Sequence, residues 1–350
     1  MKKLRTGIIG TGMAFEKLHC PAFEELSDYY EITAICDIDP QKLQYWSQYL
    51  QLEDKHVYNN YRKMLEQEEL DLVDIMVPIE ENYPVARDAA WEGIPIICEK
   101  PLAADREQAK AHRELAQKYK VPIMIAENYR YSEETAVLKS LIDNKQMGEP
   151  LFFVQLRAVD FPQERWENQF PAKEWRQHPE YPGGAVLDMA VHNLAALRHI
   201  FGPVDSVHGL GKKQNADWSP YSVVNVNILF KSGMPGQFTF YCGGSEVQRP
   251  LIGLRIFCTR GMIYLEENTC GIINLFHNDG TREHIPFRPD RGFYNELLNF
   301  YRAASGQEEI TVTPEIEYGD TKIVFDILES IETGNPVQVD PEPALPQGQA

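Results

Sequence analysis

Two side chains of this sequence have types and a spacing suited to moving a proton. Asp188 and His192 stand four residues apart in a stretch, from Ala185 to Ile200, that is apolar on nearly every side. At helical spacing they share one face and can meet. A carboxylate raises the basicity of an imidazole and holds one tautomer, which suits a general base. The alternative is a buried pair that only satisfies itself, because either group is costly to bury alone.

A third group, the ammonium of Lys100, follows an apolar run. The run Ile94–Cys98 predicts a strand buried on both faces. Ligands of open α/β sheets bind at the carboxyl ends of strands, so Glu99 and Lys100 are expected to face a crevice. Pro101 restricts the preceding residue, and a cis bond there would fix the direction of Lys100. A solvated lysine at a strand end is the ordinary alternative.

The elements that position Lys100 alternate along the first half of the chain. Apolar runs predict strands at residues 4–10, 31–36, 72–77, 94–98 and 121–126. Helical patterns separate them, and this alternation is typical of a doubly wound parallel sheet. Asn128, Tyr129 and Arg130 follow the last of these strands and are also expected to face the crevice.

A glycine turn links the first predicted strand to a helical pattern. Backbone N–H groups of such a turn, together with the helix N-terminus, can bind a pyrophosphate. The residues expected at this cofactor site are Gly10, Thr11, Gly12, Met13 and Ala14. Phe15 occupies the third position of the usual spacing, where a small residue is typical, so an ordinary turn is the alternative interpretation.

An acidic residue, Asp37, ends the second predicted strand. In a dinucleotide fold this position accepts hydrogen bonds from the ribose hydroxyls. Asp39, followed by Pro40, is well suited to cap the next helix, which leaves Asp37 for the ribose. The Asp37 carboxylate would repel a 2′-phosphate, and no arginine follows closely enough to offset it. We therefore expect NAD rather than NADP.

The second half of the chain is rich in strand patterns after Gly148. Predicted strands lie at 151–159, 204–210, 223–230, 237–242, 254–258, 262–266 and 271–277. Short turns between them predict a large, mostly antiparallel sheet, whose open face could form a subunit interface. Helices are expected at Tyr294–Ser305 and Pro314–Thr333. The predicted domains are 1–127 for the dinucleotide and 128–340 for substrate and assembly, with a tail at 341–350.

Composition excludes several classes of partner. The 350 residues carry a net charge of −18, which argues against nucleic acid and anionic membranes. No apolar run approaches the roughly 20 residues of a membrane span. The six cysteines are scattered without a CxxC pair, which indicates reduced thiols and a cytoplasmic location, and no metal is expected.

Four stretches together resemble the Gfo/Idh/MocA family of glucose–fructose oxidoreductases, inositol dehydrogenases and their relatives. They are Gly7–Gly12, Cys36–Pro40, Glu99–Pro101 and Gly183–His192. The resemblance covers nearly the whole chain. It implies an N-terminal Rossmann domain, a C-terminal α+β domain with an open sheet, and assembly into homodimers or homotetramers. It also implies that Lys100, Asp188 and His192 are catalytic.

The activity implied by the resemblance is NAD-dependent oxidation of a secondary hydroxyl of a sugar or an inositol-like polyol. His192 would take the hydroxyl proton, Asp188 would orient it, and Lys100 would hydrogen-bond the oxygen while hydride leaves for the nicotinamide. Lys100 as the base is an alternative. Two other functions stay open: an enzyme that retains its NAD for epimerisation or glycoside cleavage, and a regulator that senses a dinucleotide or a sugar without catalysis.

Departures from the family pattern bear on the cofactor and substrate sites. After Pro78, relatives often carry Asn and then His, whereas Asn82 occupies the His position here. The residues expected near the cofactor, besides the glycine turn and Asp37, are Pro78, Asn82, Glu99, Lys100 and Asn128. Ala195 stands where many relatives have Asp. The expected substrate contacts are Lys100, Tyr129, Arg130, Trp175, Arg176, Asp188, His192 and Asn193. Arg130 or Arg176 could instead bind a carboxylate or phosphate of the substrate, and packing or surface exposure is the alternative for each contact.

Overall fold

The computed structural model describes residues 2–159, 161, 174–243 and 253–339. The chain divides into two compact units. The first comprises Met1–Asn128 and Gly292–Tyr318, and the second comprises Tyr129–Arg291 and Gly319–Ala350. The segment Gly292–Tyr318 therefore belongs with the N-terminal unit, whereas the boundaries predicted from composition place it in the second domain. The predicted tail at 341–350 lies outside the described residues.

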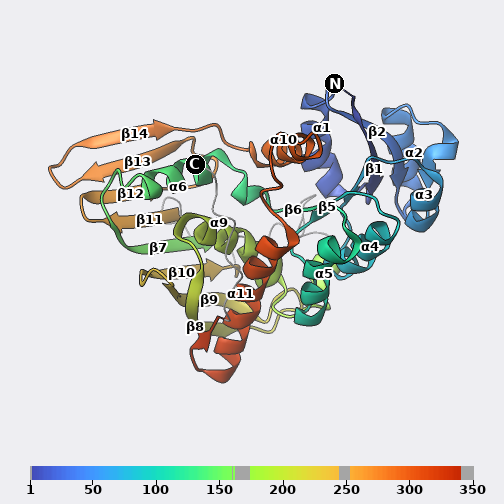
Figure 1. Ribbon diagram of the computed structural model, residues 1–350. Helices are drawn as coiled ribbons and strands as arrows, with labels where there is room; N and C mark the ends of the chain where they lie inside the picture. Colours follow the sequence, from blue (N-terminus) through green and yellow to red (C-terminus); the bar gives the residue numbers. More distant parts are fainter. Residues whose placement is uncertain (1, 160, 162–173, 244–252, 340–350) are drawn as a thin grey trace. The chain divides into compact units, whose positions relative to one another are not determined.

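The first unit contains a six-stranded parallel sheet with strand order β3-β2-β1-β4-β5-β6. Figure 1 labels its strands β1, β2, β5 and β6. Its strands are β1 Leu4–Ile9, β2 Tyr30–Cys36, β3 Val57–Tyr58, β4 Leu72–Ile75, β5 Ile96–Glu99 and β6 Ile123–Ala126. The strand order reverses between β1 and β4, and open α/β sheets bind their ligands at such a switch point. The predicted doubly wound parallel sheet is confirmed.

Helices pack against this sheet in two groups. Their bounds are η1 Phe15–His19, α1 Cys20–Glu25, α2 Pro40–Tyr49, η2 Asp54–His56, α3 Tyr61–Gln67, α4 Ile79–Trp91, α5 Arg106–Tyr119 and α10 Gly292–Ala304. Helix α10 contacts α1 and η1, whereas α4 contacts α3 and α5. Asp39 caps α2 by accepting a hydrogen bond from the Gln41 N–H, as expected from its place before a proline.

The second unit contains a nine-stranded sheet with strand order β14-β13-β12-β11-β7-β10-β9-β8-β15. The strands are β7 Pro150–Ala158, β8 Val204–Lys213, β9 Tyr221–Phe230, β10 Pro235–Tyr241, β11 Gly253–Cys258, β12 Gly261–Leu265, β13 Ile272–His277, β14 Arg282–Pro286 and β15 Val337–Gln338. Neighbouring strands are antiparallel except β7 and β10, which run parallel. The mostly antiparallel sheet expected from the sequence is confirmed, and β14 and β15 are additions to it.

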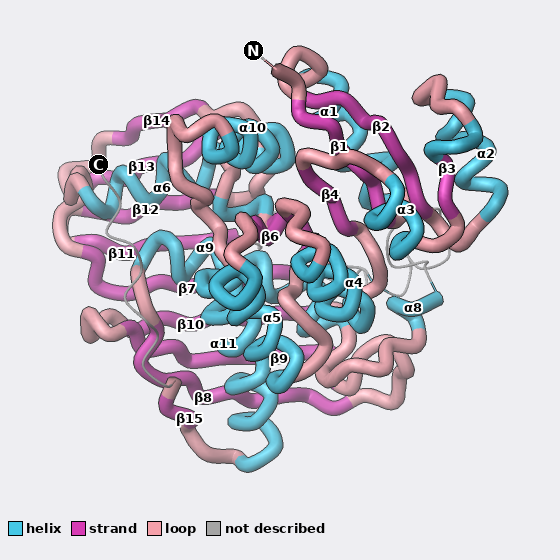
Figure 2. The backbone as a smooth tube through the Cα atoms, turned by 45° about the vertical axis from the view of Figure 1, so that its right-hand side comes forward, coloured by secondary structure: helices cyan, strands magenta, loops and turns pink. Residues whose placement is uncertain are grey.

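Helices cover one face of the second sheet, as Figure 2 shows for α9 and α11. The helices associated with this unit are η3 Asn128–Arg130, α6 Glu133–Asp143, α8 Glu174–Gln177, η5 Val186–Ala190, α9 Val191–Phe201 and α11 Pro314–Thr333. Gly209 of β8 lies so close to α11 that an added Cβ would meet the Ile331 side chain at 2.9 Å. None of the helices within the described residues is long and apolar enough to cross a membrane.

A buried ion cluster holds the second unit together. Asp320 of α11 is fully buried, and Arg130 binds both of its oxygens at 2.7 Å. Arg198 of α9 donates a further hydrogen bond to Asp320 Oδ1 at 2.8 Å. Two guanidinium groups thus share one carboxylate, and their charge stabilises its ionised form, so the pKa of Asp320 lies below its usual value despite the burial. The cluster ties α11 to α9 and to the start of the unit.

Replacing Asp320 tests the strength of this cluster. Asp320→Ala removes the carboxylate that both buried guanidinium groups bind, so we expect the free energy of unfolding to fall by about 3–5 kcal/mol in urea denaturation of the full chain. The matched control is Asp143→Ala, which removes the exposed Lys139–Asp143 pair on α6 and should cost less than about 0.5 kcal/mol. Equal losses in the two variants would contradict this account.

Candidate active site

The glycine turn after β1 packs tightly against the protein at Gly10 and has free space beside it at Gly12. Gly10 has φ of +93°, and an added Cβ would overlap the carbonyl oxygen of Met76 at the end of β4. Its N–H donates to the Cys36 carbonyl at 2.8 Å, which holds the turn to β2. Around Gly12, by contrast, an added Cβ would find only the Lys42 Nζ atom, at 4.0 Å. The turn therefore has room for a ligand against its backbone, as a pyrophosphate requires.

Asp37, at the tip of β2, braces this turn. Its Oδ2 atom accepts hydrogen bonds from the Thr11 N–H at 2.7 Å and the Thr11 hydroxyl at 2.9 Å. Its Oδ1 atom accepts one hydrogen bond, from the Asp39 N–H at 2.9 Å. A carboxylate oxygen can accept two, so Oδ1 retains capacity for a ribose hydroxyl. Asp37 thus fits the predicted cofactor role and also has a structural role, because it holds Thr11 in the turn.

A lysine lies beside Asp37. Lys42 Nζ is 3.8 Å from Asp37 Oδ2, and the lysine side chain is 41% exposed. No arginine follows Asp37 closely, so among the described residues Lys42 is the cation nearest to a 2′-phosphate at this position. Lys42 reduces the repulsion that Asp37 alone would exert on a phosphate.

The aromatic residue in the third glycine position belongs to the core. Phe15 is fully buried, and its ring packs edge-on against Trp46 of α2 at 4.7 Å between centroids. The Trp46 indole N–H donates to the Thr11 carbonyl at 3.1 Å. Phe15 therefore supports the turn from beneath, and the departure from the usual spacing is accommodated by packing.

The Glu99–Lys100–Pro101 segment lies at the carboxyl end of β5, and its Lys100–Pro101 bond is cis. The Lys100 N–H donates to Glu99 Oε2 at 3.1 Å. Asn82 of α4 is buried, and its Nδ2 atom donates to the carbonyls of Glu99 and Pro101, both at 2.9 Å. The cofactor residue expected at Asn82 therefore acts on the backbone on both sides of Lys100.

The remaining cofactor residues differ in exposure. Met13 is buried, Ala14 and Asn128 are half-buried, and Pro78 is exposed where it precedes α4. The backbone of Asn128 packs against Gly292 at the start of α10, where an added Cβ would meet the Asn128 side chain at 3.0 Å. Gly292 brings α10, from the far end of the chain, to the end of β6.

In the second unit, Asp188 and His192 lie on either side of a change in helix type. Asp188 is buried in the π-helical turn η5, and His192 is half-buried in the first turn of α9. Arg176 of α8 binds Asp188, with 2.6 Å between Nε and Oδ2. The Tyr129 ring stacks on the His192 imidazole at 4.6 Å, with 21° between the ring planes. The structure therefore brings four of the predicted substrate residues together in two pairs.

Other predicted substrate residues have different surroundings. The Arg130 guanidinium binds Asp320 in the buried cluster of the second unit, which gives it a structural role in place of the expected substrate contact. Asn193 is buried in α9 and is 5% exposed. Ala195, on the same helix, is fully buried, where a methyl group packs and a carboxylate would be costly. Trp175 lies in α8, but its side chain is outside the described part of the chain.

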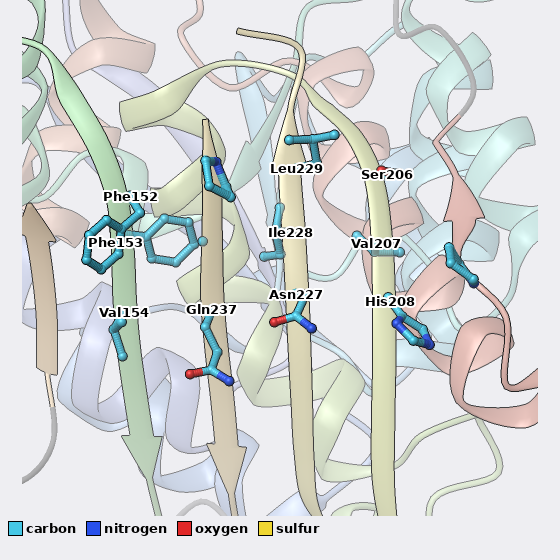
Figure 3. Close-up of a pocket in the computed structure, with 13 residues that line it drawn as sticks. Phe152, Phe153, Val154, Ser206, Val207, His208, Asn227, Ile228, Leu229 and Gln237 are labelled. Carbon is cyan, nitrogen blue, oxygen red and sulfur yellow. The ribbon is translucent and has the colours of Figure 1, made fainter. Parts of the chain in front are cut away.

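A shallow hollow on the second sheet is separate from these residues. Strands β7, β8, β9 and β10 line it, with Phe152, Asn227 and Gln237 among the side chains drawn in Figure 3. None of the predicted catalytic residues lines it. Among the described residues, no group of three His, Cys, Asp or Glu side chains is placed to hold a metal ion.

Comparisons with known proteins give a consistent result. Residues 4–127 match the model of an oxidoreductase family with an NAD-binding Rossmann fold, GFO/IDH/MocA. Residues 135–264 match the C-terminal domain of the same family.

Individual relatives and a solved structure agree with this match. An uncharacterized protein of Saccharomyces cerevisiae is 25% identical over 88% of this chain and 90% of its own length. A D-apiose dehydrogenase of Paraburkholderia graminis is 26% identical over 67% of this chain and 59% of its own length. The crystal structure of an oxidoreductase from Thermotoga maritima, 27% identical, has a TM-score of 0.86 over 96% of this chain and 98% of that one.

Gly10→Ala tests the glycine turn. We expect it to destabilise the chain and to weaken NADH binding, because the new Cβ would overlap the Met76 carbonyl. Gly93→Ala is the matched control: Gly93 also has positive φ, +76°, but nothing lies within 4 Å of an added Cβ. The control should lose only the roughly 1–2 kcal/mol of a left-handed residue and keep its affinity for NADH. Urea unfolding and NADH fluorescence titration measure both effects, and similar behaviour of the two variants would count against the close approach.

Proposed function

Because the chain belongs to the Gfo/Idh/MocA family of NAD(P)-binding oxidoreductases, we propose that it is an NAD-dependent dehydrogenase that oxidises a secondary hydroxyl of a sugar or cyclic polyol. The observation that carries the proposal is the segment Glu99–Pro101, where a lysine at the end of a parallel strand is held by Glu99 and Asn82. The D-apiose dehydrogenase among the relatives supports a sugar as the class of substrate.

The residues of the proposed mechanism have distinct tasks. Lys100 donates a hydrogen bond to the substrate oxygen and stabilises the negative charge that develops there. His192 takes the hydroxyl proton on a ring nitrogen, with its ring plane fixed by Tyr129. Asp188, which Arg176 holds in place, orients His192 on the same helical face. NAD, when bound, supplies the acceptor for the hydride that leaves the substrate carbon.

The presence of Asp37 at the end of β2 supports NAD as the preferred cofactor. Its carboxylate can accept a hydrogen bond from a ribose hydroxyl and would repel a 2′-phosphate. Lys42 lies close to it and weakens that repulsion, so we expect a preference for NAD and not an exclusion of NADP. The cysteines among the described residues are all free, five of them buried, which supports a reducing compartment such as the cytoplasm.

The face of the second sheet that lies away from α9 and α11 supports a homo-oligomer. Phe152, Leu210 and Leu229 are 40%, 64% and 38% exposed. The Phe152 ring stacks on Phe257 at 4.4 Å, which extends the apolar surface from β7 to β11. Exposed apolar groups gathered on one face favour association, and an isologous pair with a second copy would bury the same face twice.

A panel of sugars tests the proposed activity. Purified protein with NAD⁺ or NADP⁺ and D-apiose, D-xylose, D-glucose or myo-inositol should form reduced cofactor with at least one of them, and faster with NAD⁺. Exchange of a substrate C–H without net NADH would indicate an enzyme that retains its cofactor. NADH binding without turnover or exchange would favour a regulator.

Lys100→Met tests the catalytic assignment. Turnover of the best substrate of the panel should fall at least about a hundredfold, because the charge on the developing alkoxide is lost. NADH binding should persist. Lys63→Met, on the exposed face of α3, is the control and should retain full activity. Activity of Lys100→Met equal to that of the control would remove Lys100 from the mechanism.

Charge on the open sheet face tests the proposed oligomer. Phe152→Glu and Leu229→Glu should shift the protein to a monomer in sedimentation velocity, because paired carboxylates would be buried at the interface. Trp91→Glu is the matched control, since Trp91 is 73% exposed but lies in α4 of the first unit. A wild-type protein that sediments as a monomer would end this proposal.

A further inference from the structure

A buried group of ionisable side chains in the first unit includes Glu99, the residue before Lys100. Its members come from separate elements and are His19 of η1, Asp74 of β4, Glu99 of β5, Glu127 after β6 and Glu296 of α10. His19, Asp74, Glu127 and Glu296 are all fully buried, and the Glu99 side chain is 13% exposed. Neither the family match nor the proposed mechanism gives this group a task.

His19 joins two neighbouring strands of the sheet. Its Nδ1 atom is 2.7 Å from Asp74 Oδ2, and its Nε2 atom is 3.1 Å from Glu99 Oε1. Each ring nitrogen faces a carboxyl oxygen, so both carry a proton when the two carboxyl groups are ionised. Burial raises the pKa of Asp74, and the nearby His19 opposes that rise. The Phe293 ring packs against the imidazole at 5.5 Å and restricts its rotation. Although burial alone would lower the pKa of His19, Asp74 and Glu99 raise it well above its usual value.

Glu296 determines how much negative charge surrounds this imidazole. Neither of its carboxyl oxygens has a hydrogen-bond partner among the described residues. Burial raises the pKa of Glu296 well above its usual value, and His19 only partly opposes this. The nearby carboxylates of Glu99 and Asp74 add to the rise. A neutral Glu296 leaves one imidazolium between two carboxylates, a charge balance that a buried site can hold.

The hydrogen bonds continue from His19 to the backbone of Lys100. Glu99 binds His19 through Oε1 and accepts the Lys100 N–H through Oε2, at 3.1 Å in each case. Asn82 fixes the carbonyls of Glu99 and Pro101 from the other side. Since the Glu99 carboxylate binds both His19 and the Lys100 N–H, a change at His19 can reach the backbone of Lys100.

We propose that His19, held as an imidazolium between Asp74 and Glu99, is a positioning residue that sets the direction of Lys100 through the Glu99 carboxylate. The inference rests on the proposed catalytic role of Lys100. His19 itself touches neither substrate nor cofactor. Through it, η1 is joined to β4 and to the carboxyl end of β5, where Lys100 follows.

The protonation state of His19 is tested by NMR on the full chain. Long-range ¹H–¹⁵N spectra report both ring nitrogens, and the His19 signals are those absent from His19→Gln. We expect both nitrogens to stay protonated well above the pH of about 6.5 at which a free imidazole loses a proton. The titratable groups around the ring are Asp74, Glu99, Glu127, Glu296, Cys98 and Tyr30. Asp74 and Glu99 raise the pKa of His19, whereas burial raises the pKa of Glu296, Cys98 and Tyr30 and favours their neutral forms. A neutral ring at pH 7 would overturn the proposal.

The effect on Lys100 is tested by competitive acetylation with acetic anhydride, read lysine by lysine in mass spectrometry. His19→Gln should change the rate at Lys100 severalfold relative to Lys42, with the other lysines unaffected. The control is His56→Gln, which breaks a 2.7 Å histidine–glutamate hydrogen bond elsewhere in the same unit and should leave Lys100 unchanged. An unaltered Lys100 rate in folded His19→Gln would overturn the proposal.

Kinetics separate positioning from stability. With the best substrate of the sugar panel, His19→Gln should lower kcat at least about tenfold, as a small misplacement of a catalytic group does, while KM for NAD stays unchanged. If His19→Gln does not fold, Asp74→Asn replaces it: the amide keeps the shape but not the charge, so the His19 ring should lose its second proton at lower pH and Lys100 should again change. If no sugar is oxidised by the wild type, the proposed function fails, whereas the NMR and acetylation results still decide this inference.

Discussion

The carboxyl ends of parallel strands lie at the same edge of their sheet. This constraint decides where the candidate functional residues of the first unit lie. The residues that follow β1, β2 and β5 must share one edge of the sheet, although Gly10, Asp37 and Lys100 are far apart in the chain. A glycine is required where the turn passes the Met76 carbonyl, and a carboxylate is required where Thr11 donates two hydrogen bonds. The Cys36 carbonyl at the end of β2 holds Gly10, and Thr11 in the turn after β1 holds Asp37.

Much of this edge was predictable because it depends on local pattern. Apolar runs locate the strands, alternation with helices gives the parallel sheet, and the proline after Lys100 marks the end of β5. Helix α11 begins and ends where its periodicity indicates, at Pro314 and Thr333. The cap of α2 follows from Asp39 standing before a proline. In all of these, the residues that decide the structure lie within a few positions of one another.

Partners that come from distant segments were not predictable in this way. Arg130 reaches Asp320 across 190 positions of the chain, and a charged residue after a strand gives no sign that it will be buried. Arg176 approaches Asp188 from a separate short helix, so the i,i+4 spacing suggested His192 as the only partner. His19 lies in a helical pattern that gives no sign of its partners. Those partners, Asp74 and Glu99, come from β4 and β5, much later in the chain.

The π-helical turns show a second reason for the differences. Both η1 and η5 contain an extra residue per turn, which a 3.6-residue pattern does not reveal. His19 closes the first of them and Asp188 lies in the second. In each case the wider turn carries a buried ionisable group to a partner outside its own helix. Edge strands β14 and β15 escaped prediction for a simpler reason, since polar or very short segments lack an apolar alternation.

The position of β7 in the second sheet has a consequence for how the protein is made. This strand is the first of its sheet in the chain, yet it lies in the middle, between β10 and β11. During synthesis, the backbone groups on both edges of Pro150–Ala158 therefore stay unpaired until residues 235–258 have been made. Pairings over such distances form slowly, and open strand edges invite contact with other nascent chains. Until both partner strands have been made, β7 is therefore a strand that other chains can pair with.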